Sequence, residues 1–223
     1  MPALSDFRLD VFAQLRECPA PVVDRNVIRA AIVLCQRAPI WTETLADITL
    51  TAGTSEYTLA PSTAITSAGG EIIRPVLDGV RYRQRPLRQL SLDAANVARP
   101  GWTQDQGKEP TQYVMLSPRN LTLIPIPEDT LTDPLQVQVS VRPSRKATTM
   151  PDVLYDHWYD AITSGALQFL LSMPKTPWSD PGAALYHRRI FLNEQTNARA
   201  QYERGYGDGS ARVWSRPFVS RRR

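Results

Sequence analysis

Three side chains able to serve as metal ligands or as an acid–base pair lie close together, namely Asp156, His157 and Asp160. The surrounding residues have helical spacing, so Asp156 and Asp160 share a face as an i, i+4 pair while His157 points about 100° away. This arrangement favours a solvated helix face over a converging site. A metal-dependent hydrolase built around His157 and Asp160 remains as an alternative hypothesis.

The rest of the sequence lacks the motifs of common catalytic sites. His187 is the other histidine, and its spacing favours a partly buried packing role. No nucleophile elbow, phosphate-binding loop, dinucleotide fingerprint or H-E-x-x-H helix is present. Gly69-Gly70 precedes a predicted strand, so it cannot present helix N-terminal amides to a phosphate. We therefore expect no enzyme, and no catalytic, cofactor-binding or metal-binding residue.

The positive charge of the chain is concentrated at its C-terminus. The net charge is +4, and residues 207–223 hold five of the 26 basic side chains but one of the 22 acidic ones. The remaining 206 residues are therefore balanced. A neutral body with a basic tail argues against a broad nucleic-acid-binding face on the body.

Composition also bears on the compartment. The two cysteines, Cys18 and Cys35, are expected about 16 Å apart along a helical hairpin, too far for a disulfide. No apolar run approaches the roughly 18 residues of a membrane span, so no membrane partner is expected. Asp6 and Asp10 stand where a signal peptide would be basic and then apolar. We expect a protein that is cytosolic when made.

The strongest pattern is a helical hairpin over residues 151–206. Leu154, Trp158, Ile162 and Ala166 recur at spacings of three and four and predict a helix that ends near Met173-Pro174. Ser179 or Asp180 is expected to cap a second helix that begins at Pro181. Its apolar face is marked by Ala184, His187, Phe191, Ala198 and Tyr202 and is expected to be widened by Leu185 and Leu192, and Gly205 is its expected C-cap.

A second helical hairpin is predicted over residues 1–44. Ser5 is expected to cap a helix whose buried residues are Leu9, Phe12 and Leu15. After the breaker at Cys18–Pro21, Asp24 is expected to cap a helix that Pro39 terminates. Short helices need tertiary packing, and the natural partner is the hairpin at 151–206. The two hairpins would form a four-helix bundle.

Residues 45–150 change to a strand period and predict a small antiparallel β domain inserted into the helical one. The expected strands are 48–50, 57–59, 71–77, 112–117, 120–124 and 135–141, the last with four apolar side chains on one face. Asp78-Gly79 is predicted to be a tight turn. The polar stretch from Asp93 to Thr111 is predicted to be a long loop, often a functional feature in compact domains.

After Gly205 the helical pattern stops, and residues 207–223 predict an extended C-terminal arm. Its arginines alternate with Val213, Trp214 and Phe218. Aromatic residues and arginine are enriched at binding hot spots, so we interpret the arm as a segment that orders on a partner. A solvated terminus is the alternative. The complete expectation is an α+β protein.

Several local strings occur in the order of a known family. The first hairpin ends at Trp41, and AGTSEYTL, the Asp78-Gly79 pair, LTLIPIP, VSVRPSRKATTMPDVLYDHW, ITSGAL, MPKTPWSDP and RVWSRPF follow. Between them lies a W…G…P…Y segment made by Trp102, Gly107, Pro110 and Tyr113. Taken together, almost the whole chain resembles the head-to-tail adaptor (connector, or head-completion) proteins of tailed bacteriophages, especially short-tailed ones.

The resemblance implies a dodecameric ring beneath the portal protein, in the neck of the virion. The helical bundle would form the ring wall, the β domain would face the tail tube or nozzle, and genomic DNA would pass through the channel. Carried over by residue, the portal-binding arm is Arg212, Val213, Trp214, Arg216, Pro217 and Phe218. The segment Ser91–Thr111, with Trp102 and Lys108, is the weaker candidate for a tail-side contact. Arg221, Arg222 and Arg223 would meet the portal or DNA.

Two other functions remain open. The arginine-rich tail fits a nucleic-acid-binding protein, whose affinity for duplex DNA would fall steeply with salt. Another neck or tail component, such as a tube terminator, would share the structural role and differ in its position in the virion.

Overall fold

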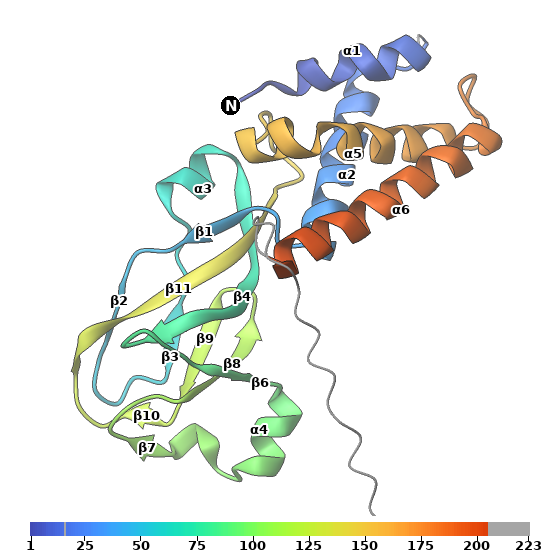
Figure 1. The fold of residues 1–223 in the computed structure, drawn as a ribbon. Coiled ribbons are helices and arrows are strands. Elements are labelled where there is room, and N and C mark those ends of the chain that lie inside the picture. The colour runs from blue at the N-terminus through green and yellow to red at the C-terminus, as the bar shows by residue number, and fades with distance from the viewer. Residues whose placement is uncertain (16, 205–223) are drawn as a thin grey trace, which may run out of the picture.

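The structure, a computed structural model, describes residues 1–15 and 17–204. It has a helical part and a β part that lie end to end (Figure 1). The helical part contains α1 (Leu4–Gln14), α2 (Ala20–Arg37), α5 (Asp152–Leu171) and α6 (Pro181–Arg204). The β part is formed by the chain between α2 and α5. The predicted α+β class is confirmed.

Helix α5 is the central element of the helical part and is packed against α1, α2 and α6. Phe7 of α1 is fully buried and packs on Tyr155 and Tyr159, with ring centroids 5.4 and 4.8 Å away. A kink at Trp158 (φ −127°, ψ 17°) separates the first turns of α5 from the rest. Helix α2 crosses behind α5 instead of running alongside it (Figure 1). A regular four-helix bundle is therefore not confirmed.

The C-terminal hairpin has the predicted elements. Helix α6 begins at Pro181, and Asp180 Oδ1 accepts hydrogen bonds from the amides of Gly182 (2.9 Å) and Ala183 (3.0 Å). Of the two residues that the sequence offers as a cap, Asp180 is thus the one used. The predicted C-cap Gly205 lies outside the described residues.

Replacing Asp180 with alanine is expected to lower the free energy of unfolding by about 1 kcal/mol, the usual value of an N-cap. The amides of Gly182 and Ala183 would lose their acceptor, and the positive N-terminal end of the helix would lose the nearby negative charge. Urea denaturation would measure the change. Ser179→Ala is the matched control, expected within a few tenths of a kcal/mol of the wild type. Equal losses in both variants would contradict this assignment.

The N-terminal hairpin differs from the prediction in three respects. Ser5 was expected to cap the first helix, but α1 already begins at Leu4 with Ala3 at the N-cap position, so Ser5 lies inside the first turn. Leu9 was expected in the core but is 75% exposed, whereas Phe7 and Val11 are fully buried. Asp24 was expected to cap the second helix, but α2 already begins at Ala20 after Pro19. The Asp24 carboxylate instead accepts hydrogen bonds from Arg8 Nε (2.7 Å) and a terminal guanidinium nitrogen (2.5 Å). This ion pair ties α1 to α2.

The β part contains two principal sheets. The five-stranded sheet has the order β1 (Thr42–Thr44), β11 (Leu131–Pro143), β4 (Gly70–Tyr82) and β5 (Arg85–Pro86), with β2 (Ile48–Leu50) also paired to β11. The four-stranded sheet has the order β3 (Glu56–Thr58), β9 (Asn120–Ile124), β8 (Gln112–Ser117) and β6 (Arg88–Leu90). Short strands β7 (Gln106–Gly107) and β10 (Ile126–Pro127) pair separately, and α3 (Thr63–Ser67) precedes β4.

Two strand predictions are confirmed, and one turn prediction is wrong. Strand β11 buries the four alternating apolar residues of 135–141, and β8 and β9 form the expected hairpin. Asp78-Gly79 was expected to be a tight turn, but β4 runs through it, with Asp78 at φ 56° and a register shift between Val137 and Val139 of β11. A β-bulge therefore stands where a turn was predicted. The chain reverses later, at Arg83 and Gln84, both with positive φ.

One buried cluster extends from the helices into the five-stranded sheet. Trp41, at the end of the first hairpin, is buried there, and a Cβ at Gly70 would lie 2.5 Å from its ring. Val141 of β11 is also in this cluster. Because the core is shared, the separation of the chain into domains at residues 44 and 150 stays a prediction.

Candidate interaction surfaces

The residues first considered for chemistry do not converge. Asp156, His157 and Asp160 are all exposed on the first turns of α5. Within residues 1–15 and 17–204, no group of three or more His, Cys, Asp or Glu side chains is placed to hold a metal ion. The ring of His187 is buried, and its Nε2 lies 3.2 Å from Gln14 Oε1. Burial lowers the pKa of His187, as expected for a packing role.

A hollow of about 550 Å³ lies where α3 and β1 meet the start of α5, with Trp41, Glu43, Ala64, Asp152, Val153 and His157 among its lining residues. Glu43 accepts a hydrogen bond from Trp41 Nε1 at 3.2 Å, so its carboxylate helps to hold that ring. The polar groups of the hollow come from separate elements. They do not form the nucleophile and base pair of a hydrolytic site.

The predicted loop from Asp93 to Thr111 is an ordered unit. It contains most of α4 (Leu92–Ala98), a 3₁₀ turn at Trp102–Gln104 and strand β7. The Ser91 side chain caps α4 by accepting a hydrogen bond from the Ala94 amide at 3.2 Å. Ala95 and Trp102 form a small second core with Val114 of β8 and Ile124 of β9. The loop prediction is therefore wrong. The residues that complete this core, Val114 and Ile124, lie outside the segment, so its own composition does not reveal the packing.

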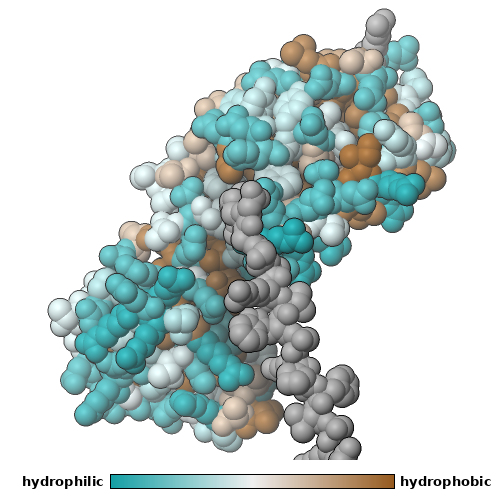
Figure 2. Space-filling model, in the orientation of Figure 1, coloured by the Kyte–Doolittle hydropathy of each residue, from teal (hydrophilic) through white to brown (hydrophobic). Residues whose placement is uncertain are grey.

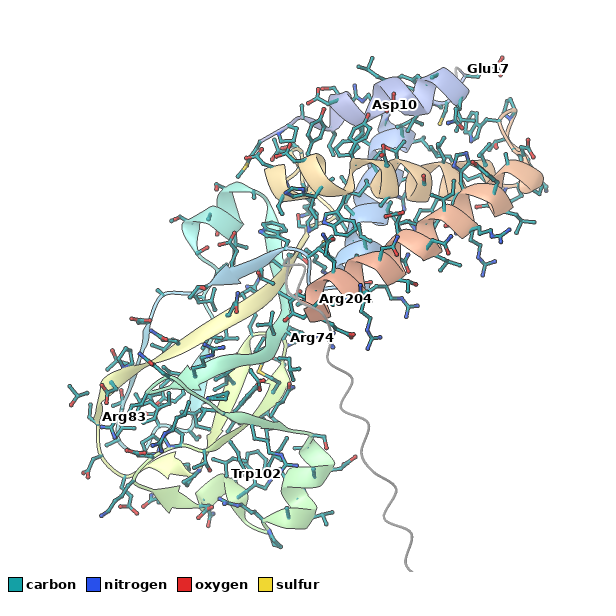
Figure 3. The ribbon with its side chains drawn as sticks, viewed as in Figure 1. Asp10, Glu17, Arg74, Arg83, Trp102 and Arg204 are labelled. Carbon is teal, nitrogen blue, oxygen red and sulfur yellow. The ribbon has the colours of Figure 1, made fainter. Side chains whose placement is uncertain are left out.

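Trp102 holds this unit together from inside. Its side chain is buried, and its Nε1 donates a hydrogen bond to Asn96 Oδ1 at 2.8 Å (Figure 3). Arg99 also bonds Asp105 at 2.9 Å across the same bend. Trp102, proposed from the sequence as a contact residue, is thus placed to support the unit, and a partner would meet its neighbours.

Lys108, the other tail-side candidate, is exposed near the end of β7. The next residue, Glu109, pairs with Arg83, and Arg83 also pairs with Asp133 of β11. These contacts attach the unit to the five-stranded sheet. Two further exposed apolar side chains on α4, Leu92 (48%) and Val97 (83%), were missed by the sequence reasoning. The N-cap serine at position 91 was the available signal for α4.

The predicted portal-binding arm, Arg212 to Phe218 with Arg221, Arg222 and Arg223 beyond it, lies outside the described residues. The described chain stops at Arg204, where α6 meets β4 (Figure 3). Burial raises the pKa of Tyr202, and the charges of Arg74 and Asp78 on β4 act on the same hydroxyl. The described chain therefore ends at the junction of the helical part and the β part.

Both cysteines are free and buried, and burial raises the pKa of Cys35 to about 12. A thiol of this kind is inert at neutral pH. Among the described helices, none combines the length and apolar character required to cross a bilayer.

Comparison with family models identifies the class to which this fold belongs, the head-to-tail adaptors of tailed phages. The matching model is that of the SU10 adaptor protein, it covers residues 12–221, and the chain belongs to this family. The resemblance seen in the sequence is thereby confirmed. A search of curated proteins found no match. Family membership implies a place in the virion and association with other phage structural components.

Proposed function

We propose that this chain is the structural adaptor that forms a ring, dodecameric in the family pattern, under the portal and joins the capsid to the tail. The helical part, as a bundle around α5, would form the wall, and the β part would face the tail tube or nozzle. DNA would pass through the channel. We infer a non-enzymatic role assembled in the host cytoplasm.

The observation that carries this proposal is the extent of the family match. It spans residues 12–221 and so includes the whole arm from Arg212 to Phe218. An arm that is part of the family pattern is better explained as a docking segment than as an incidental terminus.

Removal of the arm is expected to abolish portal docking. The chain truncated after Tyr206 would fail to co-sediment with the portal ring of the same virion, whereas the intact chain would join it near stoichiometrically. Aromatic hot spots each contribute about 2 kcal/mol or more, so Trp214→Ala with Phe218→Ala should weaken docking by at least about 100-fold. Unchanged melting of both variants would show that the body remains folded.

A matched variant separates this function from nucleic-acid binding, which the five arginines of residues 207–223 favour. Replacing Arg221, Arg222 and Arg223 with glutamine leaves both aromatic residues in place. If the tail binds duplex DNA, this variant loses affinity and its salt slope falls by about one per phosphate contact removed. Normal DNA binding by the intact chain together with no portal docking would overturn the adaptor proposal. Imaging the ring in virions would separate an adaptor from a tube terminator.

A further inference from the structure

The outer face of α1 has an exposed leucine beside acidic residues. The inner face of the helix buries Leu4, Phe7 and Val11, which leaves Leu9 on the opposite side with 75% of its surface exposed. Asp6 and Asp10 flank this outer side: Asp6 is partly exposed, and Asp10 is exposed at the edge next to α5, where its carboxylate lies near the Tyr159 hydroxyl. The basic residue between them, Arg8, is turned to Asp24. The outer face of α1 is therefore apolar at its centre and acidic at its edge.

The outer face of α6 has the opposite charge around a similar centre. Its inner face buries Ala184, His187, Phe191 and Ala198. Leu185 (64% exposed) and Leu192 (48% exposed) lie two turns apart on the outside. Arg188 and Arg189 are exposed between them, and neither forms an ion pair with any residue of 1–15 or 17–204. This face is apolar at its centre and basic at its edge.

The two faces are on different sides of the helical part. Helix α1 runs along its upper edge and α6 along its lower front edge (Figure 1), and hydrophobic side chains stand among hydrophilic ones over both helices (Figure 2). One molecule therefore cannot bring its own two faces together. A second copy has the complementary face available.

We propose that the α1 face of one copy (Asp6, Leu9, Asp10) binds the α6 face of the next (Leu185, Arg188, Arg189, Leu192). Two different patches joined head to tail form a heterologous interface, which generates a closed ring when the rotation permits. The leucines would supply the buried centre, and the unlike charges would fix the orientation and exclude pairing of two identical faces. The inference rests on the proposed ring and assigns its subunit contact.

The test uses the purified full chain in sedimentation velocity runs over a concentration series, alone and with the portal ring. Leu9→Lys places a cation opposite Arg188 and Arg189, and Leu192→Glu places a carboxylate opposite Asp10. Leu116→Lys alters a leucine of the β part that is 49% exposed and serves as the matched control. Because all three positions are exposed, the variants should melt like the wild type.

We expect each interface variant to lower the association constant between copies at least tenfold while the control stays unchanged. Added salt should weaken wild-type association, because exposed charges are screened. An equimolar mixture of Leu9→Lys and Leu192→Glu provides the sharpest readout. Each variant keeps one intact face, so the unaltered α6 face of one variant can meet the unaltered α1 face of the other, and the mixture should recover association that neither variant shows alone.

The outcomes distinguish this interface from portal docking. The interface would be overturned, and docking left intact, if either variant formed the same oligomers as the wild type. The same conclusion would follow if wild-type copies bound the portal independently of one another. Association through these faces without portal binding would support the interface and overturn the docking proposal. A wild-type chain that neither associates nor docks would overturn both.

Discussion

Replacing Gly165 with valine is expected to destabilise the protein by about 3 kcal/mol, because overpacking a tight core contact is costly. Gly165 lies where α2, α5 and α6 meet. A Cβ there would be 2.8 Å from Phe191 Cε2 and 2.9 Å from the Ala30 Cβ. A branched side chain would have to push α2 and α6 away from α5. Urea denaturation followed by far-ultraviolet circular dichroism would measure the loss.

Two further variants test the reason for this loss. Gly182, at the start of α6, has only the Asp180 Oδ1 atom near its Cβ position, at 3.3 Å, so Gly182→Ala should be close to neutral. The smaller change Gly165→Ala should be partly rescued by Phe191→Leu, which removes ring atoms from the contact and gives a measurable coupling energy. Independent, additive effects of these two substitutions would contradict the contact.

The close approach at Gly165 also explains why helix packing departs from the expected bundle. Without a side chain on that face of α5, Phe191 of α6 and Ala30 of α2 both reach its backbone. Spacing along one helix predicts which face is buried, and it predicted the centre of the buried face in α5 and α6, although Leu185 and Leu192, expected to widen that of α6, are exposed. It does not predict the crossing angle, because that depends on where a small residue permits close contact.

Errors in the rest of the fold have the same origin. In α1, Leu9 was expected in the core with Phe12 and Leu15. The helix instead buries Phe7, whose ring packs on Tyr155 and Tyr159 of α5, and this orientation leaves Leu9 exposed. Asp78-Gly79 has the composition of a turn. It forms a bulge because β11 continues to pair with β4 beyond it, at Val137↔Val80 and Leu135↔Tyr82. Local sequence does not contain these partners.

The candidate interaction surfaces differ in how far sequence could reveal them. The arm was visible from its composition and from the family resemblance. The unit between Ser91 and Thr111 was recognised as a candidate but misjudged as a loop, because its Pro, Gly and polar content hid a core completed by Val114 and Ile124. The two outer faces of α1 and α6 became visible only when the structure showed which leucines remain exposed.

Replacing Trp102 with alanine is expected to open this unit while the rest of the protein stays folded. Removal of a buried tryptophan costs about 3–5 kcal/mol. Trp102 belongs to the small core with Ala95, Val114 and Ile124, apart from the main cluster, so the loss should appear as local opening. Hydrogen exchange at the amides of Ala95 and Arg99, bonded within the unit at 2.9 and 3.0 Å, should accelerate by about 100-fold or more.

The smaller variants divide this effect between packing and hydrogen bonding. Trp102→Phe keeps most of the apolar surface and loses the bond to Asn96, which should cost about 1 kcal/mol beyond the lost ring area. Thr103→Ala changes an exposed neighbour and is the control. Unaltered exchange at Ala95 and Arg99 in Trp102→Ala would contradict the supporting role.

Binding to the tail can be compared in the same variants. If Trp102→Ala binds the tail more weakly, the cause is displacement of the unit, because the Trp102 side chain is buried. A loss in Lys108→Ala would instead indicate direct contact, because that side chain is exposed.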